Sequence, residues 1–326
     1  MNNGHPRVSI GLPVYNGQKY VAESIESILA QTFKDFELII SDNGSTDRSE
    51  QICQSYAARD KRIRYYRNDV NRGAAWNHNH VLELSSGEYF KWQNHDDVCH
   101  PCFLEKCVAV MDREPDVVLC SCRVIRIDER GNAVAPGTHG WDPFWSSPVA
   151  GSGKPHERFR SLIMRRNGCE EIYGLMRAEA ARKTRPIGAY TQSDDNFLAE
   201  LILQGHFYEV PEPLFYYRLH DTQSTLSYTD RLERMIWFDP ANAGRLTIPY
   251  ARQFWEYLSL IHRAPISWLE RLRCYGHVGS AAWRFRAWLK KDLNSIFKRH
   301  TVPFFKRRAP WTRPIWHVVH KVIKVG

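Results

Sequence analysis

The chain has 326 residues and a formal charge of +9, and that charge is distributed very unevenly. Residues 282–326 contain twelve basic residues and one acid, a net charge of +11, which leaves −2 for residues 1–281. A nearly neutral body argues against a general polyanion-binding surface, so we expect no binding to nucleic acid. The composition is 43% hydrophobic, which excludes a disordered chain, and no apolar run is long enough to span a bilayer.

The start of the chain and its cysteines bear on the compartment. Residues 1–6 are mostly polar and lead directly into a strand-like run, so we expect no signal peptide and a cytoplasmic protein. The eight cysteines are then expected to be reduced thiols. Cys99 and Cys102, followed by Cys120 and Cys122, partly match a zinc-ligand pattern. Because the second pair lacks the two-residue spacing, we favour ordinary buried thiols.

Strand-like and helix-like segments alternate over the first 120 residues. The predicted strands are residues 8–13, 36–40, 63–66, 88–92 and 117–120. Helices are predicted between them, at about 21–29, after Ser45 or Thr46, at about 73–84 and after Pro101. Such alternation predicts an α/β fold with a mostly parallel sheet, right-handed crossovers and flanking helices.

The second half of the chain is less regular. Residues 131–154, rich in Gly, Pro, Trp and Ser, are predicted to form a long loop, and short helices are predicted near 159–163 and from Asp194. Two strand-like runs follow at 207–210 and 214–218, and the pattern beyond about residue 228 is helical. We therefore expect an α/β domain over residues 1–225 and a helical C-terminal extension over 226–326.

Polar residues follow the first, second and fourth predicted strands, at the edge where ligands bind in open α/β sheets. Asp96 and Asp97, after the fourth strand, can hold Mg²⁺ or Mn²⁺ by oxygen ligation, and such a metal can bridge a diphosphate. Two adjacent acids also fit a solvated turn. Asn94 and His95 add further polar groups at the same place, which favours the metal.

The strings after the first two strands fit a nucleotide pocket. In Pro13–Asn16, the ring of Tyr15 can cover a flat base, and in Asp42–Ser45 the first carboxylate can accept from a base or a ribose. Pro13–Asn16 fits ordinary turn chemistry equally well, and for Asp42–Ser45 alone a structural turn with a helix N-cap is favoured.

Two further positions can carry chemistry. Asp194 and Asp195 open a predicted helix, where acids are favoured by the helix dipole alone but where one of them can also act as a general base. His220 follows an aromatic-rich strand, and is either a metal or phosphate contact or a surface histidine.

Together, in order and spacing, these motifs resemble the inverting glycosyltransferase family 2, with its GT-A type nucleotide-diphospho-sugar transferase fold, over roughly residues 6–225. The segments that carry the resemblance are Pro13–Gly17, Asp42–Asp47, Asn71–Gly73 with Trp76–Asn77, Asn94–Asp96, Asp194–Leu198 and Tyr217–His220. Two positions depart from the family pattern. Asn43 stands where Asp is usual, and Asn94 replaces the first acid of the Asp-x-Asp motif.

The resemblance implies a Rossmann-like sheet, a nucleotide-sugar donor and a single displacement at the anomeric carbon. Tyr15 and Asp42 are compatible with uracil or thymine and do not exclude guanine, so a UDP- or dTDP-sugar is favoured over a GDP-sugar. It implies a divalent metal, Mg²⁺ or Mn²⁺, on Asp96, Asp97 and His220, and Asp195 as the base with Asp194 beside it. The nucleotide contacts that it implies are Pro13, Tyr15, Asn16, Asp42, Asn43, Asn77 and Asp96.

The resemblance also implies an acceptor hydroxyl on a glycan or a lipid-linked molecule, in the synthesis of a cell-surface polysaccharide or glycolipid. The alternative is a non-catalytic sugar-nucleotide-binding or scaffold protein on the same fold, in view of Asn43 and Asn94. The four acids retained at the rim argue against that alternative.

The basic tail, residues 282–326, predicts a second kind of contact. An apolar helical stripe in it is surrounded by basic residues, and consists of Phe285, Leu289, Leu293, Ile296 and Phe297. A basic, aromatic-rich amphipathic helix suits an anionic membrane surface, which would place the protein at the inner face of the cell membrane. A helix docked on the catalytic domain is the alternative.

Overall fold

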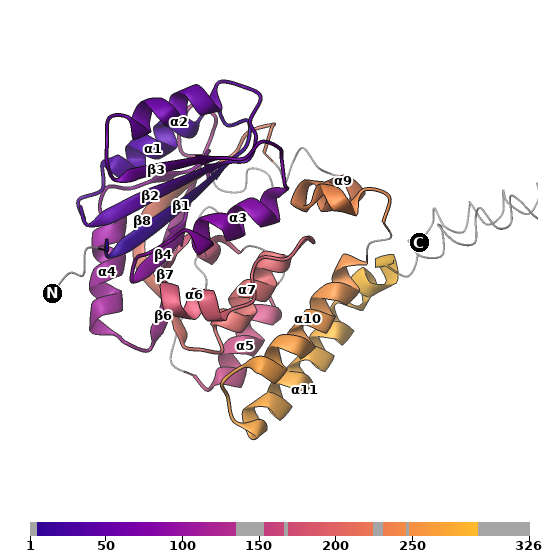
Figure 1. The fold of residues 1–326 in the computed structure, drawn as a ribbon. Helices are drawn as coiled ribbons and strands as arrows, with labels where there is room; N and C mark the ends of the chain where they lie inside the picture. Colours follow the sequence, from indigo (N-terminus) through magenta and orange to yellow (C-terminus); the bar gives the residue numbers. More distant parts are fainter. Residues whose placement is uncertain (1–4, 135–152, 166–168, 224–230, 246–247, 293–326) are drawn as a thin grey trace, which may run out of the picture.

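The computed structural model describes residues 5–134, 153–165, 169–223, 231–245 and 248–292, and its centre is one sheet with helices on both faces (Figure 1). The strands, in the order β3-β2-β1-β4-β7-β6-β8-β5 across the sheet, are β1 (Val8–Val14), β2 (Phe36–Asp42), β3 (Ile63–Arg67), β4 (Tyr89–Trp92), β5 (Val98–Cys99), β6 (Val117–Ile127), β7 (Leu175–Arg177) and β8 (His206–Arg218). The α-helices are α1 (Val21–Leu29), α2 (Ser49–Ala57), α3 (Ala74–Glu83), α4 (Phe103–Arg113), α5 (Pro155–Ile163), α6 (Ala178–Lys183), α7 (Ser193–Leu201), α9 (Arg231–Phe238), α10 (Pro249–Arg263) and α11 (Trp268–Arg284).

Most strands of the sheet run in one direction. β1 pairs in parallel with β2 and β4, β2 with β3, and β6 with β8. β7 lies antiparallel between β4 and β6, and β5 is antiparallel to β8. The predicted mostly parallel α/β sheet is therefore confirmed. The carboxyl ends of β1, β2, β3, β4, β6 and β8 meet at one edge, which is where the polar motifs lie.

The sheet is buried on both faces, as expected for parallel strands covered by helices. All seven residues of β1 are buried. In β2, Leu38 and Ile40 belong to the core shared with α1 and α4, while Ile39 points to the opposite core. On that second face α3 packs very closely: a Cβ at Gly11 would lie 2.5 Å from Cγ2 of Val81. The position therefore requires glycine.

The C-terminal helices cover this second core and contribute buried residues to it, among them Tyr257, Ile261 and Val278 (Figure 1). α10 packs on α7 and on α11, and α11 also packs on α5. Of the stripe predicted for membrane contact, Phe285 is buried and Leu289 packs against the core, whereas residues 293–326 lie outside the described residues. For these two residues the docked alternative is observed. None of the helices in the described part of the chain is both long and apolar enough to cross a membrane.

Several elements differ from the sequence prediction. β8 is one continuous strand, although Pro211 and Pro213 divide its sequence into two runs. The β6–β8 pairing shifts register on both sides of Arg123, which pairs with Pro213, and this irregularity accommodates the prolines. β6 continues to Ile127, well beyond the predicted end. β5, β7 and α6 were not predicted.

Two further predictions concern the start of α2 and the state of the cysteines. α2 begins at Ser49 rather than after Ser45 or Thr46, and Asp47 accepts a hydrogen bond from the Ser49 backbone N–H at 2.9 Å. Six of the eight cysteines are buried, and Cys102 and Cys169 are half-buried.

Candidate active site

The turns after β1 and β2 are joined to each other at the edge of the sheet. The backbone N–H of Asn16 donates to Oγ of Ser45 at 2.9 Å, and Oδ1 of Asn16 accepts from the backbone N–H of Thr46 at 2.9 Å. Asn16 adopts a left-handed backbone, with φ of 50°. This arrangement leaves the ring of Tyr15 exposed at the rim, while Pro13 is buried in the strand.

Asp42 lies beneath this rim rather than on it. Its side chain has no exposed surface. Oδ1 accepts from the backbone N–H of Ser45 at 2.8 Å, and Oδ2 accepts from the Tyr65 hydroxyl at 2.9 Å. The structure thus gives Asp42 an organising role in the turn, and a direct contact with a base stays a prediction.

The hydrogen bonds of Asn43 explain why an amide stands where the family usually has Asp. Its Oδ1 accepts from Asn68 Nδ2 and from the Arg72 backbone N–H, both at 3.1 Å. Its Nδ2 donates to Oδ1 of Asn71 at 2.9 Å and to the Gly73 carbonyl at 3.2 Å. A carboxylate cannot donate, so only an amide satisfies all four partners. Asn43 therefore ties the turn after β2 to the segment that enters α3.

Asn77 of α3 reaches the same edge from the other face of the sheet. Its Nδ2 donates to the carbonyls of Ser41 and Val14, at 2.9 and 3.3 Å. Its Oδ1 is buried and has no hydrogen-bond partner within the described structure. A buried acceptor without a donor costs free energy, which marks it as a candidate contact for a ligand.

Asp96 and Asp97 point in different directions after β4. Oδ2 of Asp96 lies 3.0 Å from Nε2 of His220. Asp97 is 1% exposed; its Oδ1 accepts from the Arg218 backbone N–H at 2.9 Å and its Oδ2 from Asn94 Nδ2 at 3.0 Å. The structure thus brings Asp96 and His220 together, whereas Asp97 holds the end of β8.

The two carboxyl groups differ electrostatically as well. Burial and the charge of Asp96 raise the pKa of Asp97 well above its ordinary value, against the hydrogen bonds that it accepts. For Asp96, burial alone would raise the pKa, but the nearby charges of His95 and His220 hold the pKa below its ordinary value. Asp96 is therefore the carboxylate prepared to bind a cation.

The residues present fit only a divalent-metal site that has few protein ligands. Within the described residues, no three His, Cys, Asp or Glu side chains surround a common metal position. Magnesium sites in phosphate chemistry, however, use one or two protein carboxylates together with the phosphates of the substrate. Asp96 supplies such a carboxylate, and Nε2 of His220 lies beside it. The Nδ1 of His220 lies 2.8 Å from Oγ1 of Thr222, which orients the ring.

Arg218 supports this site and was not singled out from the sequence. It is 1% exposed, although it ends a strand at the sheet edge. Its guanidinium donates to the carbonyls of Asp96, Asp128 and Glu129 at 2.9, 3.3 and 3.2 Å. It also pairs with Glu23 of α1 at 2.6 Å. Arg218 thereby fixes the backbone that carries Asp96.

Asp194 and Asp195 begin α7 and face different surroundings. Oδ2 of Asp194 accepts from the Cys169 thiol at 2.9 Å. Oδ1 of Asp195 lies 3.8 Å from Nη2 of Arg165, and its side chain remains 26% exposed. Burial and the charge of Asp194 raise the pKa of Asp195 to about 7, against the opposing charge of Arg165. A carboxyl group with this pKa is suited to general-base chemistry near neutral pH.

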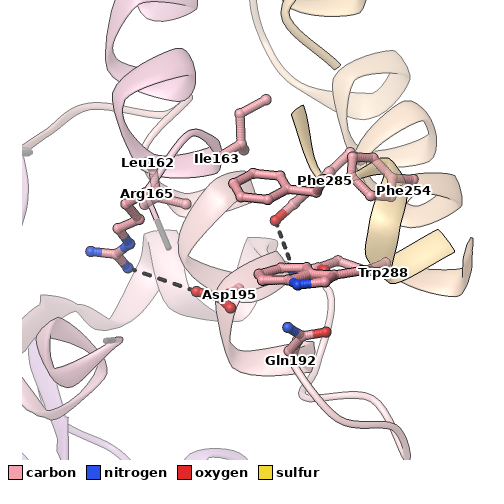
Figure 2. A pocket seen from close by; sticks show the side chains of 10 residues that line it. Leu162, Ile163, Arg165, Gln192, Asp195, Phe254, Phe285 and Trp288 are labelled. Atoms are coloured by element: carbon pink, nitrogen blue, oxygen red, sulfur yellow. Dashed lines mark hydrogen bonds and ion pairs between the residues drawn. The ribbon is translucent and has the colours of Figure 1, made fainter. Parts of the chain in front are cut away.

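A small pocket, partly open to solvent, adjoins Asp195 (Figure 2). Figure 2 shows Asp195 between Arg165 and Trp288. The aromatic residues that line the pocket come from α10 and the segment after α11, and are Phe254, Tyr257, Phe285 and Trp288. Gln192, also in the lining, has a left-handed backbone with φ of 70° and a buried Oε1 without a partner in the described structure. None of these residues was predicted as part of a site.

Comparison with known proteins decides the family. Residues 9–170 match the profile of "Glycosyl transferase family 2". EpsE of Bacillus subtilis (strain 168), which carries a glycosyltransferase name, is 30% identical over 216 residues, covering 65% of this chain and 75% of EpsE. The chain belongs to glycosyltransferase family 2, and it is a glycosyltransferase. An uncharacterized glycosyltransferase of Haemophilus influenzae is 28% identical over 226 residues, 68% of each chain.

Solved structures confirm the fold of this family 2 enzyme. S. aureus TarS 1–349 in complex with UDP-GlcNAc has a TM-score of 0.57 at 16% identity, over 95% of this chain and 78% of that chain. The mannosyltransferase PcManGT from Pyrobaculum calidifontis, in complex with GDP-Man and Mn²⁺, has a TM-score of 0.50 at 14% identity, over 90% and 86% of the two chains. At these identities the similarity shows the GT-A fold alone.

Proposed function

We propose that the protein transfers a sugar from a nucleotide diphospho-sugar, a UDP- or dTDP-sugar, to a hydroxyl of an acceptor, with inversion at the anomeric carbon. The observation that carries this proposal is Asp195, a partly exposed carboxyl group whose pKa is raised to about 7 at the mouth of a pocket. The nucleotide complexes of TarS and PcManGT support a nucleotide-sugar donor.

The donor lies along the carboxyl edge of the sheet in this proposal. Tyr15 covers the base, Asn16 and the turn organised by Asp42 and Asn43 border it, and Oδ1 of Asn77 is an acceptor available to a donor group of the nucleotide. Asp96 and His220 would hold Mg²⁺ or Mn²⁺, with Arg218 positioning Asp96. When bound, the metal supplies a positive charge that stabilises the diphosphate as it leaves.

Asp195 acts on the acceptor in a single displacement. The acceptor oxygen forms its bond to the anomeric carbon while the bond from that carbon to the diphosphate oxygen breaks. The acceptor's proton passes to Asp195. Arg165, 3.8 Å away, favours the ionised form of Asp195 that accepts the proton, while burial and Asp194 keep the carboxylate basic enough to take it.

The pocket beside Asp195 is where the acceptor enters. Its four aromatic side chains suit the apolar faces of a sugar ring, and the unpartnered Oε1 of Gln192 can accept a hydrogen bond from a neighbouring hydroxyl. We take the acceptor to be a glycan or a lipid-linked sugar. The corresponding biological setting is synthesis of a cell-surface polysaccharide or glycolipid, by a cytoplasmic enzyme at the inner face of the membrane. Contact of the tail, residues 282–326, with that membrane belongs to the same proposal.

A panel of nucleotides tests this function. The melting temperature of the full chain is measured with UDP, dTDP, GDP and their sugars, with and without Mn²⁺, and donor hydrolysis is measured in parallel. We expect uridine or thymidine nucleotides to raise the melting temperature and Mn²⁺ to enlarge the effect. Asp96→Asn should remove the Mn²⁺ increment. A protein that no nucleotide stabilises, or that binds donors without ever hydrolysing them, contradicts the proposal.

A further inference from the structure

The outer sides of α10 and α11 expose an unusual amount of apolar surface. Nine large hydrophobic side chains of the described residues are exposed, and six of them lie on these two helices. We call these six residues the Trp face: Trp255, Leu258, Trp268, Leu269, Leu272 and Trp283, with exposed fractions of 66, 39, 73, 43, 61 and 73%. Concentration of this kind marks an interaction surface, because single exposed apolar residues are otherwise scattered.

Helix periodicity accounts for the separation of the Trp face from the core. α11 buries Cys274, Val278 and Ala281 toward the body, and its opposite side carries Leu269, Leu272 and Trp283. Between Leu272 and Trp283, Gly276 and Gly279 face open space, because nothing lies within 4 Å of a Cβ built on either residue. From Trp268 to Trp283 the helix rises about 22 Å, at about 1.5 Å per residue. The Trp face is thus an extended surface rather than a pocket.

The charges around the Trp face have one sign. Residues 249–292 contain eight basic residues and three acids. The acids are turned inward: the side chains of Glu256 and Glu270 are 4% and 14% exposed, and Asp292 is 2% exposed and accepts from the Ala251 backbone N–H. The exposed charges are therefore cationic.

The cations are concentrated around Trp283. Arg284, Arg286 and Lys290 are exposed in the turns that follow it. The guanidinium of Arg286 lies over the Trp283 ring, 4.9 Å from its centroid. Tryptophan and arginine side by side are typical of surfaces at the water–lipid boundary, where an indole lies among headgroups and a guanidinium binds phosphate.

We propose that the Trp face docks the protein on an anionic phospholipid bilayer. Trp268 and Trp283 lie at headgroup depth, and Arg284 and Arg286 contact lipid phosphates. A second copy of the chain is disfavoured as the occupant, because face-to-face pairing would bring these arginines together while the acids of both helices stay buried. Phe285 and Trp288 line the pocket beside Asp195 directly after Trp283, so docking holds that pocket near the membrane. The docking itself does not rest on the proposed chemistry.

Co-sedimentation of the full chain with lipid vesicles tests the proposal. Vesicles of phosphatidylcholine alone are compared with vesicles that also contain phosphatidylglycerol. We expect binding to the anionic vesicles. The pair Trp268→Ser and Trp283→Ser should lower the partition coefficient by about tenfold or more. The pair Arg284→Gln and Arg286→Gln should lower it by roughly 25-fold, at about fivefold per charge.

A matched control comes from α4, which lies on the far side of the sheet from α11 (Figure 1). Lys106→Gln with Arg113→Gln removes the same charge from exposed positions and should leave vesicle binding unchanged. Because the substituted Trp-face residues are exposed, both variants should keep the parent's melting temperature and its response to UDP.

Three results would overturn the proposal. The parent chain does not bind anionic vesicles; the tryptophan variant binds them as well as the parent does; or the parent is a dimer in solution that the tryptophan variant dissociates. Residues 293–326 are identical in every variant, so binding through that segment produces the second result. In each of these cases the protein should still bind nucleotide. Such binding shows that docking has failed while the proposed transferase function has not.

Discussion

Asp195→Asn should abolish transfer and stabilise the protein at the same time. The amide has the shape of the carboxyl group but cannot take a proton from the acceptor. Loss of a general base typically lowers turnover by about 10²- to 10⁴-fold. Asp195 lies beside the pocket rather than at the nucleotide turns, so the affinity for UDP should not change.

The stability gain follows from the pKa. Burial and the charge of Asp194 raise the pKa of Asp195 from its ordinary 3.8 to about 7. The folded protein therefore binds this proton more tightly than the unfolded chain does, and ionised Asp195 destabilises the fold as pH rises. A shift of about three pKa units corresponds to at most about 4 kcal/mol. The gain from Asp195→Asn should be absent below about pH 4 and reach its full size above about pH 7.

Two measurements check this prediction. Urea unfolding of parent and variant at pH 5 and pH 8 gives the difference in free energy of unfolding, which should be larger at pH 8. Donor hydrolysis gives the loss of activity. Arg165 keeps its ion pair with Glu171 at 2.5 Å in the variant, so no buried charge is left without a partner. A variant that retains turnover refutes the base assignment, and one that is less stable than the parent at pH 8 refutes the electrostatic reasoning.

Four other substitutions follow from the geometry of the site. Asp194→Asn removes the like charge beside the base, so the acid limb of the kcat/KM profile should move to lower pH; a limb that stays in place contradicts the coupling. Asn43→Asp restores the family's residue but loses the donor to the Gly73 carbonyl, so we expect about 1–3 kcal/mol lower stability in urea unfolding. Asp96→Asn should weaken the Mn²⁺ effect on nucleotide binding, whereas Asp97→Asn should leave that effect unchanged, because Asp97 faces the Arg218 backbone and Asn94. Equal effects of these two on Mn²⁺ would show that Asp97 is also a ligand.

The central strands of the sheet could be predicted because each has a clear pattern in the local sequence. In β1 and β2 each strand is a short apolar run that ends in a polar turn, and helix periodicity follows directly. β8 was divided wrongly because Pro211 and Pro213 ordinarily interrupt a strand, and only its irregular pairing with β6 accommodates them. β7 has three residues, too few for any periodic pattern to be read.

The site was predictable as a set of motifs but not as a geometry. Asp96 and Asp97 look equivalent in sequence, and their different roles depend on which of them the end of β8 meets. The pocket depends on contacts between α10, the segment after α11 and α7, across long sequence separations. Arg218 lies inside the Tyr217–His220 motif, and the available signal was a basic residue at the end of an aromatic-rich strand.

The anomer released first by the enzyme tests the single displacement most directly. The full chain is incubated with an α-linked donor such as UDP-GlcNAc and Mn²⁺, with water as the acceptor, and the sugar is followed by proton NMR before it mutarotates. Deprotonation of the attacking water by Asp195 on the face opposite the diphosphate predicts that the β anomer appears first, and that Asp195→Asn releases none. Initial release of the α anomer would contradict the single displacement.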